Sequence, residues 1–227
     1  MLIGALADVH GNFDAMSLAM ERHPEVPFWL CVGDLASRTG AYPEPPVPLY
    51  WIKGNNEDFE RIAAWTSGAP APRNLHLIPN GTAITAGPLR VAGLGGTFAP
   101  TWFDTPATQL PHTPRDDKRR HFVREEAETC KRLGRVDILM THEAARPFVV
   151  VTEPPRPGGR VRRLDAGKPA INDVLAALKP RLHLCGHHHR FIENEREGVR
   201  SVCIDRVNRS YLLIDAASLA YRKVDQV

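Results

Sequence analysis

The sequence predicts an α/β fold in which two packed mixed sheets carry helices on their outer faces. Short apolar runs alternate with helical or polar stretches, and strand-like runs dominate the end of the chain. The first run, Leu2–Ala7, shows no polar alternation, which is typical of a strand in a sheet covered on both faces. Together these observations favour helices layered against sheets.

Strands separated by turn residues, together with two helices, are predicted for the first half of the chain. Asn12 is the expected N-cap of the first helix, which should end near Arg22, because its side chain can accept from a free backbone N–H. Asn56 is the expected cap of the second, with Glu57 and Asp58 at the positive end of the helix dipole. The strands are expected at Phe28–Val32, Leu49–Ile52, Leu75–Ile78, Thr82–Thr85 and Leu89–Leu94.

The second half should contain a helix from about Arg115 to Leu133 and another from Ala170 to Leu178. Its strands are expected at Val136–Met140, Leu182–Cys185, Val199–Ile204, Tyr211–Ile214 and Leu219–Val224. Proline density excludes helix and central strand from three segments, Tyr42–Pro48, Phe98–Pro114 and Glu153–Arg163. Strand-like runs continue on both sides of each segment, so we expect one domain over residues 1–227.

Composition sets bounds on partners and location. The net charge of +3, from 29 basic and 26 acidic residues, is too small to indicate a nucleic-acid or membrane partner by itself. The four cysteines form no CxxC pair, as expected of a reduced intracellular protein. The short apolar start lacks a basic leader, and no run is long enough to span a bilayer. We therefore expect a cytoplasmic location and no membrane partner.

Five short polar motifs stand at the ends of predicted strands, where ligands collect in α/β folds. Each alone has an ordinary explanation, such as a turn or a packed histidine. Together they supply only carboxylate, amide and imidazole groups, which suit Mn, Fe or Zn. Two such ions about 3.5–4 Å apart can clamp a phosphoryl group. The motifs are Asp8-Val9-His10, Gly33-Asp34, Gly54-Asn55-Asn56-Glu57, Thr141-His142 and Gly186-His187-His188-His189.

In their order these motifs resemble the calcineurin-like metallophosphoesterase superfamily, over nearly the whole chain. The resemblance implies a four-layer α-β-β-α sandwich and two divalent or trivalent metal ions. It also implies hydrolysis of a phosphate ester by a metal-bridging hydroxide. Transferred by motif, the first ion is held by Asp8, His10 and His189, the second by Asn55, His142 and His187, and Asp34 bridges both.

Two further positions carry expectations from the same resemblance. Arg38 matches an arginine that grips phosphate in the Ser/Thr phosphatase branch, although Ser37 replaces the aspartate before it; an ordinary surface arginine is the alternative. Asn56 replaces a histidine that contacts phosphate and helps to protonate the leaving group. An amide cannot deliver that proton near neutral pH, so His112 or His121 would have to do so, or the metals or water.

The spacing from Asn74-Leu75 through Leu89–Gly96, and on to Arg119–Arg124 and Asp137-Ile138, resembles that of the catalytic domain of RNA lariat-debranching enzymes. The altered motif with Asn56 is similar to that of small bacterial phosphodiesterases, which have Cys at this position. This favours a phosphodiester substrate, with nucleotide and RNA as candidates. A phosphomonoesterase acting on protein or nucleotide, and a non-catalytic scaffold of the same fold, are the alternatives. Substrate contacts or an ordinary solvated face would explain the basic residues of two loops, Arg115, Lys118, Arg119, Arg120, Arg156, Arg160, Arg162 and Arg163.

Overall fold

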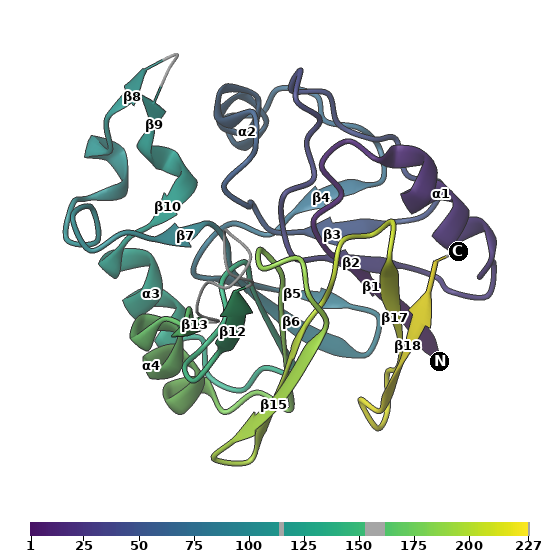
Figure 1. Ribbon diagram of the computed structural model, residues 1–227. Helices are drawn as coiled ribbons and strands as arrows, with labels where there is room; N and C mark the ends of the chain where they lie inside the picture. Colours follow the sequence, from purple (N-terminus) through teal and green to yellow (C-terminus); the bar gives the residue numbers. More distant parts are fainter. Residues whose placement is uncertain (114–115, 153–161, 227) are drawn as a thin grey trace, which may run out of the picture.

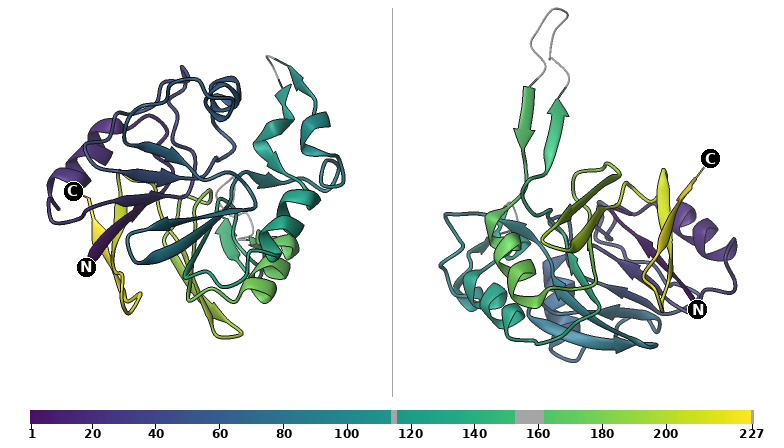
Figure 2. Two further views of the ribbon diagram at one scale, coloured as in Figure 1. Left: turned by 180° about the vertical axis from the view of Figure 1, so that it is seen from behind. Right: turned by 90° about the horizontal axis from the view of Figure 1, so that it is seen from below.

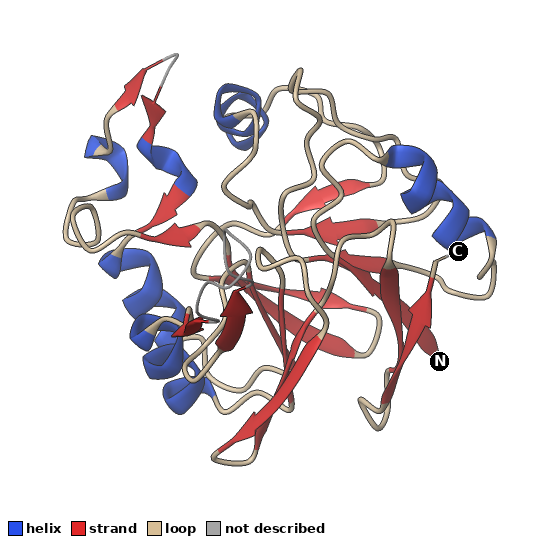
Figure 3. Cartoon of the chain, in the orientation of Figure 1, coloured by secondary structure: helices blue, strands red, loops and turns tan. Residues whose placement is uncertain are grey.

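Two mixed sheets packed face to face form the centre of the protein, and helices cover the outer face of each (Figures 1 and 3). The computed structural model describes residues 1–113, 116–152 and 162–226. Both the α/β class and the four-layer arrangement predicted from the sequence are confirmed.

The first sheet has six strands in the order β18-β17-β1-β2-β3-β4. Strands β1 to β4 run parallel to one another, while β17 and β18 are antiparallel additions. Their bounds are β1 Leu2–Leu6, β2 Trp29–Cys31, β3 Leu49–Trp51, β4 Leu75–Leu77, β17 Ser210–Asp215 and β18 Tyr221–Asp225.

The second sheet also has six strands, in the order β15-β16-β14-β11-β6-β5. Its four inner strands are parallel and its two edge strands antiparallel. Their bounds are β5 Thr82–Ala86, β6 Leu89–Leu94, β11 Ile138–Thr141, β14 Leu182–Cys185, β15 Ile192–Arg196 and β16 Val199–Cys203. Strand β15 is absent from the sequence prediction because its residues, IENER, carry few apolar side chains.

Three clusters of buried side chains hold the layers together. The central one lies between the sheets and includes Ile3, Ile52 and Met140. The second joins the first sheet to α1 (Phe13–Glu21) and α2 (Phe59–Thr66), and the third joins the second sheet to α3 (Arg124–Lys131) and α4 (Pro169–Leu178). Burial of apolar area on both faces of each sheet explains why β1 shows no polar alternation.

The predicted N-cap is confirmed for the first helix and wrong for the second. Asn12 caps α1 as predicted, and its side chain accepts from the Ala15 N–H. The predicted cap at Asn56 is wrong: α2 begins later, and Asp58 accepts from the Arg61 N–H instead. Asn56 is unable to cap because its backbone N–H and its side-chain amide both donate to Asp34, which fixes its orientation.

The helix predicted from Arg115 to Leu133 is also too long. In the described part of that range the α-helix is confined to α3, and Lys118–Arg120 forms a separate 3-10 turn. Lys53 Nζ donates to the carbonyls of Arg119 and His121, which removes those acceptors from helical pairing. His121–Phe122 (β10) instead pairs with Thr97–Phe98 (β7).

An arm and a ribbon extend from the two sheets. The arm contains the 3-10 turns Ala107–Gln109 and Lys118–Arg120 and the short hairpin β8–β9 (His112–Thr113, Asp116–Asp117). The ribbon, β12–β13 (Val149–Thr152, Arg162–Asp165), projects from the body in the right-hand view of Figure 2. Within the described part of the chain, none of the helices has the length and hydropathy needed to cross a membrane.

Candidate metal centre

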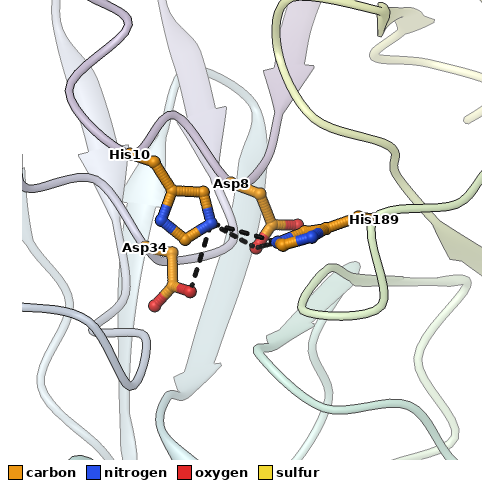
Figure 4. A group of neighbouring side chains, drawn as sticks. All are labelled: Asp8, His10, Asp34 and His189. Atoms are coloured by element: carbon orange, nitrogen blue, oxygen red, sulfur yellow. Dashed lines mark hydrogen bonds and ion pairs between the residues drawn. The ribbon is translucent and has the colours of Figure 1, made fainter.

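The predicted ligands converge because they follow parallel strands at one edge of each sheet. Asp8 and His10 follow β1, Asp34 follows β2, and Asn55 follows β3. From the second sheet, His142 follows β11, and His187 and His189 follow β14. Facing sheets thus deliver all seven residues to one place, and Figure 4 shows four of them pointing toward each other.

The first group consists of Asp8, His10, Asp34 and His189, whose ligand atoms all lie within 4.8 Å of one another. The Nε2 atoms of His10 and His189 are 3.0 Å apart. His10 Nε2 is 3.6 Å from Asp34 Oδ2, and His189 Nε2 is 3.6 Å from Asp8 Oδ1. Two imidazole nitrogens and two carboxylates therefore face one point.

The second group consists of Asp34, His142 and His187, with the same spacing limit of 4.8 Å. Asn55 joins it through Oδ1, which lies 3.0 Å from His142 Nε2. Asp34 belongs to both groups, so its carboxylate is placed to serve two ions. The partition into two groups is the one that the motif order predicts, and the ligand roles themselves stay a prediction.

Backbone strain is concentrated at these residues. Among described residues, eight other than glycine have positive φ, and five of them are predicted ligands: Asp8, His10, Asp34, His187 and His189. A left-handed conformation costs a non-glycine residue about 1–3 kcal/mol and clusters at functional sites. All five belong to the two ligand groups, so the strain coincides with the candidate metal centre.

Glu57 and Gly54 hold Asp34 in place. The Glu57 side chain is half-buried, and its carboxylate accepts from the N–H groups of Leu35, Ala36 and Gly54 and from the Tyr42 hydroxyl. A β-carbon on Gly54 would overlap the Asp34 carboxylate, so only glycine permits this approach. The loops after β2 and β3 are thereby tied together around the shared carboxylate.

The surroundings of His142 fit a metal ion. Its Nδ1–H donates to the Val32 carbonyl at 2.8 Å, which directs Nε2 toward Asn55 Oδ1 and Asp34 Oδ1, at 3.0 and 3.4 Å. Burial lowers the pKa of His142, but the charge and hydrogen bond of Asp34, the charge of Asp8 and the hydrogen bond to Val32 together outweigh burial and raise the pKa to about 10. The site therefore stabilises positive charge where Nε2 meets two oxygens, as a cation site should.

The imidazoles of His10, His187 and His189 are neutral near neutral pH, which is the form that binds metal. Burial lowers the pKa of His187 to about 3 and that of His189 to about 4, and it also lowers the pKa of His10. Neutral imidazole is the ligand form, so these three need no deprotonation near neutral pH. With two carboxylates and an amide oxygen, the donor set fits a pair of Mn, Fe or Zn ions.

A cleft of about 1130 Å³ adjoins the centre, and its lining includes Asp8 and His10 of the first group and Asn55, which contacts His142 of the second. Arg38 lines it, as expected of a phosphate contact, and so does Asn56. On the arm, His112 is part of the lining, whereas His121 is engaged by Thr97 and is not. His112 is therefore the better placed of the two candidate proton donors.

The basic run on the arm is largely neutralised. Lys118 pairs with Asp116, Arg119 with Asp117 and Glu60, and Arg120 with Asp116. Arg115, Arg156 and Arg160 lie outside the described residues, as does the side chain of Arg162. Arg163 is exposed on β13, away from the cleft lining. For the arm, the solvated and internally paired interpretation holds better than a free anion-binding surface.

Sequence reasoning missed the roles of two residues at this site. Glu57 is predicted as part of a motif and in the first turn of a helix, but it precedes that helix, and its four hydrogen bonds organise the loops instead. Arg206 carries no sequence signal at all, and it lines the cleft beside Asp8. Its position depends on a long-range pairing of residue 206 with Ala7 that no local pattern reveals.

Comparisons with known proteins agree with this geometry. A family model described as calcineurin-like phosphoesterase matches residues 1–191. The lariat debranching enzyme of Schizosaccharomyces pombe is 23% identical over 193 residues, or 80% of this chain, which spans only 42% of that relative's length.

Solved structures share the fold. TT1561 of Thermus thermophilus aligns with a TM-score of 0.64 at 13% identity, covering 99% of this chain and 98% of that one. A protein described as a novel archaeal phosphodiesterase aligns with a TM-score of 0.53 at 11% identity, covering 99% of both chains. At such identities the likeness concerns architecture, and function must be argued from the site.

Proposed function

The chain belongs to the calcineurin-like phosphoesterase family, and from this membership we propose that it hydrolyses phosphodiester bonds in a nucleotide or RNA substrate. Hydrolysis of phosphate esters at a dinuclear metal centre is the chemistry of the family. The observation that carries the proposal is the pair of ligand groups that share Asp34 and adjoin a cleft. We further propose that residues 1–227 form one cytoplasmic domain; the four free cysteines, all buried, support a reducing compartment.

We assign the metal ligands as the sequence predicts. Asp8, His10 and His189 hold one ion, Asn55, His142 and His187 the other, and Asp34 both. When bound, two such ions polarise the phosphoryl group and make water a nucleophile near neutral pH. Manganese, iron and zinc all suit these donors, and manganese is the metal we would load first.

The protein's own groups position the substrate and the shared carboxylate. Asn56 donates from its backbone N–H and its side-chain amide to the two oxygens of Asp34, at 2.8 and 2.7 Å. Burial raises the pKa of Asp34, but the charge and hydrogen bond of His142, followed by these two bonds from Asn56, lower it by more and keep the carboxylate ionised. Arg38 stands on the loop after Asp34 and offers a cation to a phosphate oxygen.

A diester is the better fit than a monoester for two reasons. The cleft extends from Asn208 across the ligand groups to the arm, which leaves room for two substituents on phosphorus. The lariat debranching enzyme and the archaeal phosphodiesterase supply further support.

The direct test compares bis(4-nitrophenyl) phosphate with 4-nitrophenyl phosphate, using chelator-treated protein reloaded with Mn²⁺, Zn²⁺ or Fe²⁺. We expect kcat/KM to favour the diester by at least about tenfold, or about 1.4 kcal/mol, with the most active metal. A preference for the monoester would make the protein a phosphomonoesterase. Absence of hydrolysis of both esters with every metal would favour a scaffold of the same fold.

Asn56 leads to a prediction about leaving groups. Because an amide provides no proton, wild-type rates should fall steeply from a 4-nitrophenyl ester of thymidine 5′-phosphate to the dinucleotide TpT, whose leaving group is an alkoxide. Asn56→His should raise the TpT rate about 10²-fold, the lower range for a general acid. Asn208→His, on another part of the cleft lining, is the control. If wild type cleaves both substrates at similar rates, another residue already supplies the proton.

A further inference from the structure

Arg206 stands directly beside the first ligand group. Residue 206 forms a parallel β-bridge with Ala7, and the Val207 N–H donates to the Ala7 carbonyl at 3.0 Å. This pairing places Arg206 next to Asp8 on the edge where the metal ligands emerge. The bridge belongs to the segment between β16 and β17, so it fixes the backbone of an otherwise exposed loop.

Arg206 lines the same cleft as the first ligand group. Asp8, His10 and Arg206 all belong to its lining. Because residue 206 pairs with Ala7, Arg206 lines the cleft on the side of Asp8.

The guanidinium of Arg206 is also free to bind an anion. Arg206 is exposed, and none of the carboxylates in the described ranges forms an ion pair with it. Its neighbour Asp205 accepts from the backbone N–H of Arg206 and pairs with the side chain of Arg209, at 3.6 Å. The arm's cations, by contrast, are engaged by Asp116, Asp117 and Glu60.

The cleft has space for more than one phosphate group. Its volume of about 1130 Å³ lies above the roughly 300–1,000 Å³ typical of sites for drug-sized ligands. Arg38 lines it on the loop after Asp34, while Arg206 and Asn208 line it beside Asp8. Arg206 is therefore a further arginine of the cleft, on the side of Asp8 and in addition to Arg38 on the loop after Asp34.

We propose that Arg206 binds a second phosphate of the substrate, adjacent to the one that is hydrolysed, and so selects substrates with at least two phosphate groups. The inference rests on the proposed function and narrows its substrate class. A planar guanidinium suits phosphate because it can donate two parallel hydrogen bonds. The second phosphate belongs either to the next nucleotide or to an anhydride such as a diphosphate.

The experiment uses two chromogenic esters with the same leaving group, in the Mn²⁺-loaded protein. One is the 4-nitrophenyl ester of thymidine 5′-phosphate, and the other carries an additional 3′-phosphate. Wild type should show a KM roughly 10- to 100-fold lower for the second ester, the range expected of a charge-assisted contact. In Arg206→Gln that ratio of KM values should fall to about one.

Arg209→Gln is the matched control, because Arg209 is an exposed arginine of the same loop that does not line the cleft. It should retain the wild-type ratio. Competition by thymidine 3′,5′-bisphosphate and by ADP identifies the source: the inhibitor that loses potency in Arg206→Gln carries the relevant phosphate arrangement.

Two results overturn the inference. One is a wild-type KM that does not respond to the 3′-phosphate, together with inhibition by both competitors that Arg206→Gln leaves unchanged. The other is an equal rise of KM for both esters in Arg206→Gln, which would mean that Arg206 acts on the centre alone. Failure of wild type to hydrolyse either ester would contradict the proposed function itself, so the two failures are distinguishable.

Discussion

Replacing Asp34 by asparagine is expected to lower kcat/KM for bis(4-nitrophenyl) phosphate by at least about 10³-fold, since several kcal/mol of transition-state stabilisation depends on a paired metal site. Asp34 is the one residue shared by both ligand groups. The amide keeps the shape of the side chain but removes the negative charge that attracts two cations. Bound manganese should fall from two ions per chain to one or none, measured by elemental analysis after dialysis.

The fold should survive this change, because the amide oxygen of the Asp34→Asn side chain can still accept from the Asn56 backbone N–H. Asp173→Asn, an exposed substitution on α4, is the control and should alter neither metal content nor rate. Full activity of Asp34→Asn with two bound ions would refute the shared role of this carboxylate.

Replacing Glu57 by alanine should produce the largest loss of stability among the site residues. The substitution leaves the buried N–H groups of Leu35, Ala36 and Gly54 without an acceptor, and each unsatisfied donor costs about 1–3 kcal/mol. We therefore expect the free energy of unfolding in urea to fall by about 3 kcal/mol or more. Because these N–H groups belong to the loops that carry Asp34 and Asn55, affinity for manganese should fall as well.

Glu60→Ala is the matched control three residues later. Glu60 is 76% exposed and pairs with Arg119, so its loss should cost less than about 1 kcal/mol. Equal destabilisation by the two substitutions would show that the hydrogen bonds of Glu57 do not organise the site.

Much of the sheet architecture could be predicted because it depends on local apolar runs. The bounds of strands β6 and β14 agree with the prediction, since both are apolar runs that end at glycines. The predictions failed where tertiary contacts override local preference. Lys53 donates to the carbonyls of Arg119 and His121, which therefore do not take part in the predicted helix. The side chain of Asn56 donates to Asp34 and therefore does not cap the second helix.

The grouping of the ligands could be anticipated only because five motifs follow parallel strands in a recognisable order. The contacts that hold the ligands in place could not be anticipated from the sequence. Glu57 acts through backbone N–H groups 21 and 22 residues away, and Arg206 lies beside Asp8 through a bridge that spans most of the chain. Such contacts leave no periodicity in the sequence, and the left-handed backbone at Asp8, His10 and Asp34 is adopted by residues other than glycine, which no local pattern predicts.

We propose that the Asp34 carboxylate organises a pair of metal ions. Anomalous diffraction at the manganese edge from crystals of the Mn²⁺-loaded protein would locate both ions. Two peaks on opposite sides of the Asp34 carboxylate are predicted, one among Asp8, His10 and His189 and the other among Asn55, His142 and His187. A single peak, or two peaks of which either lies out of reach of Asp34, would contradict the account.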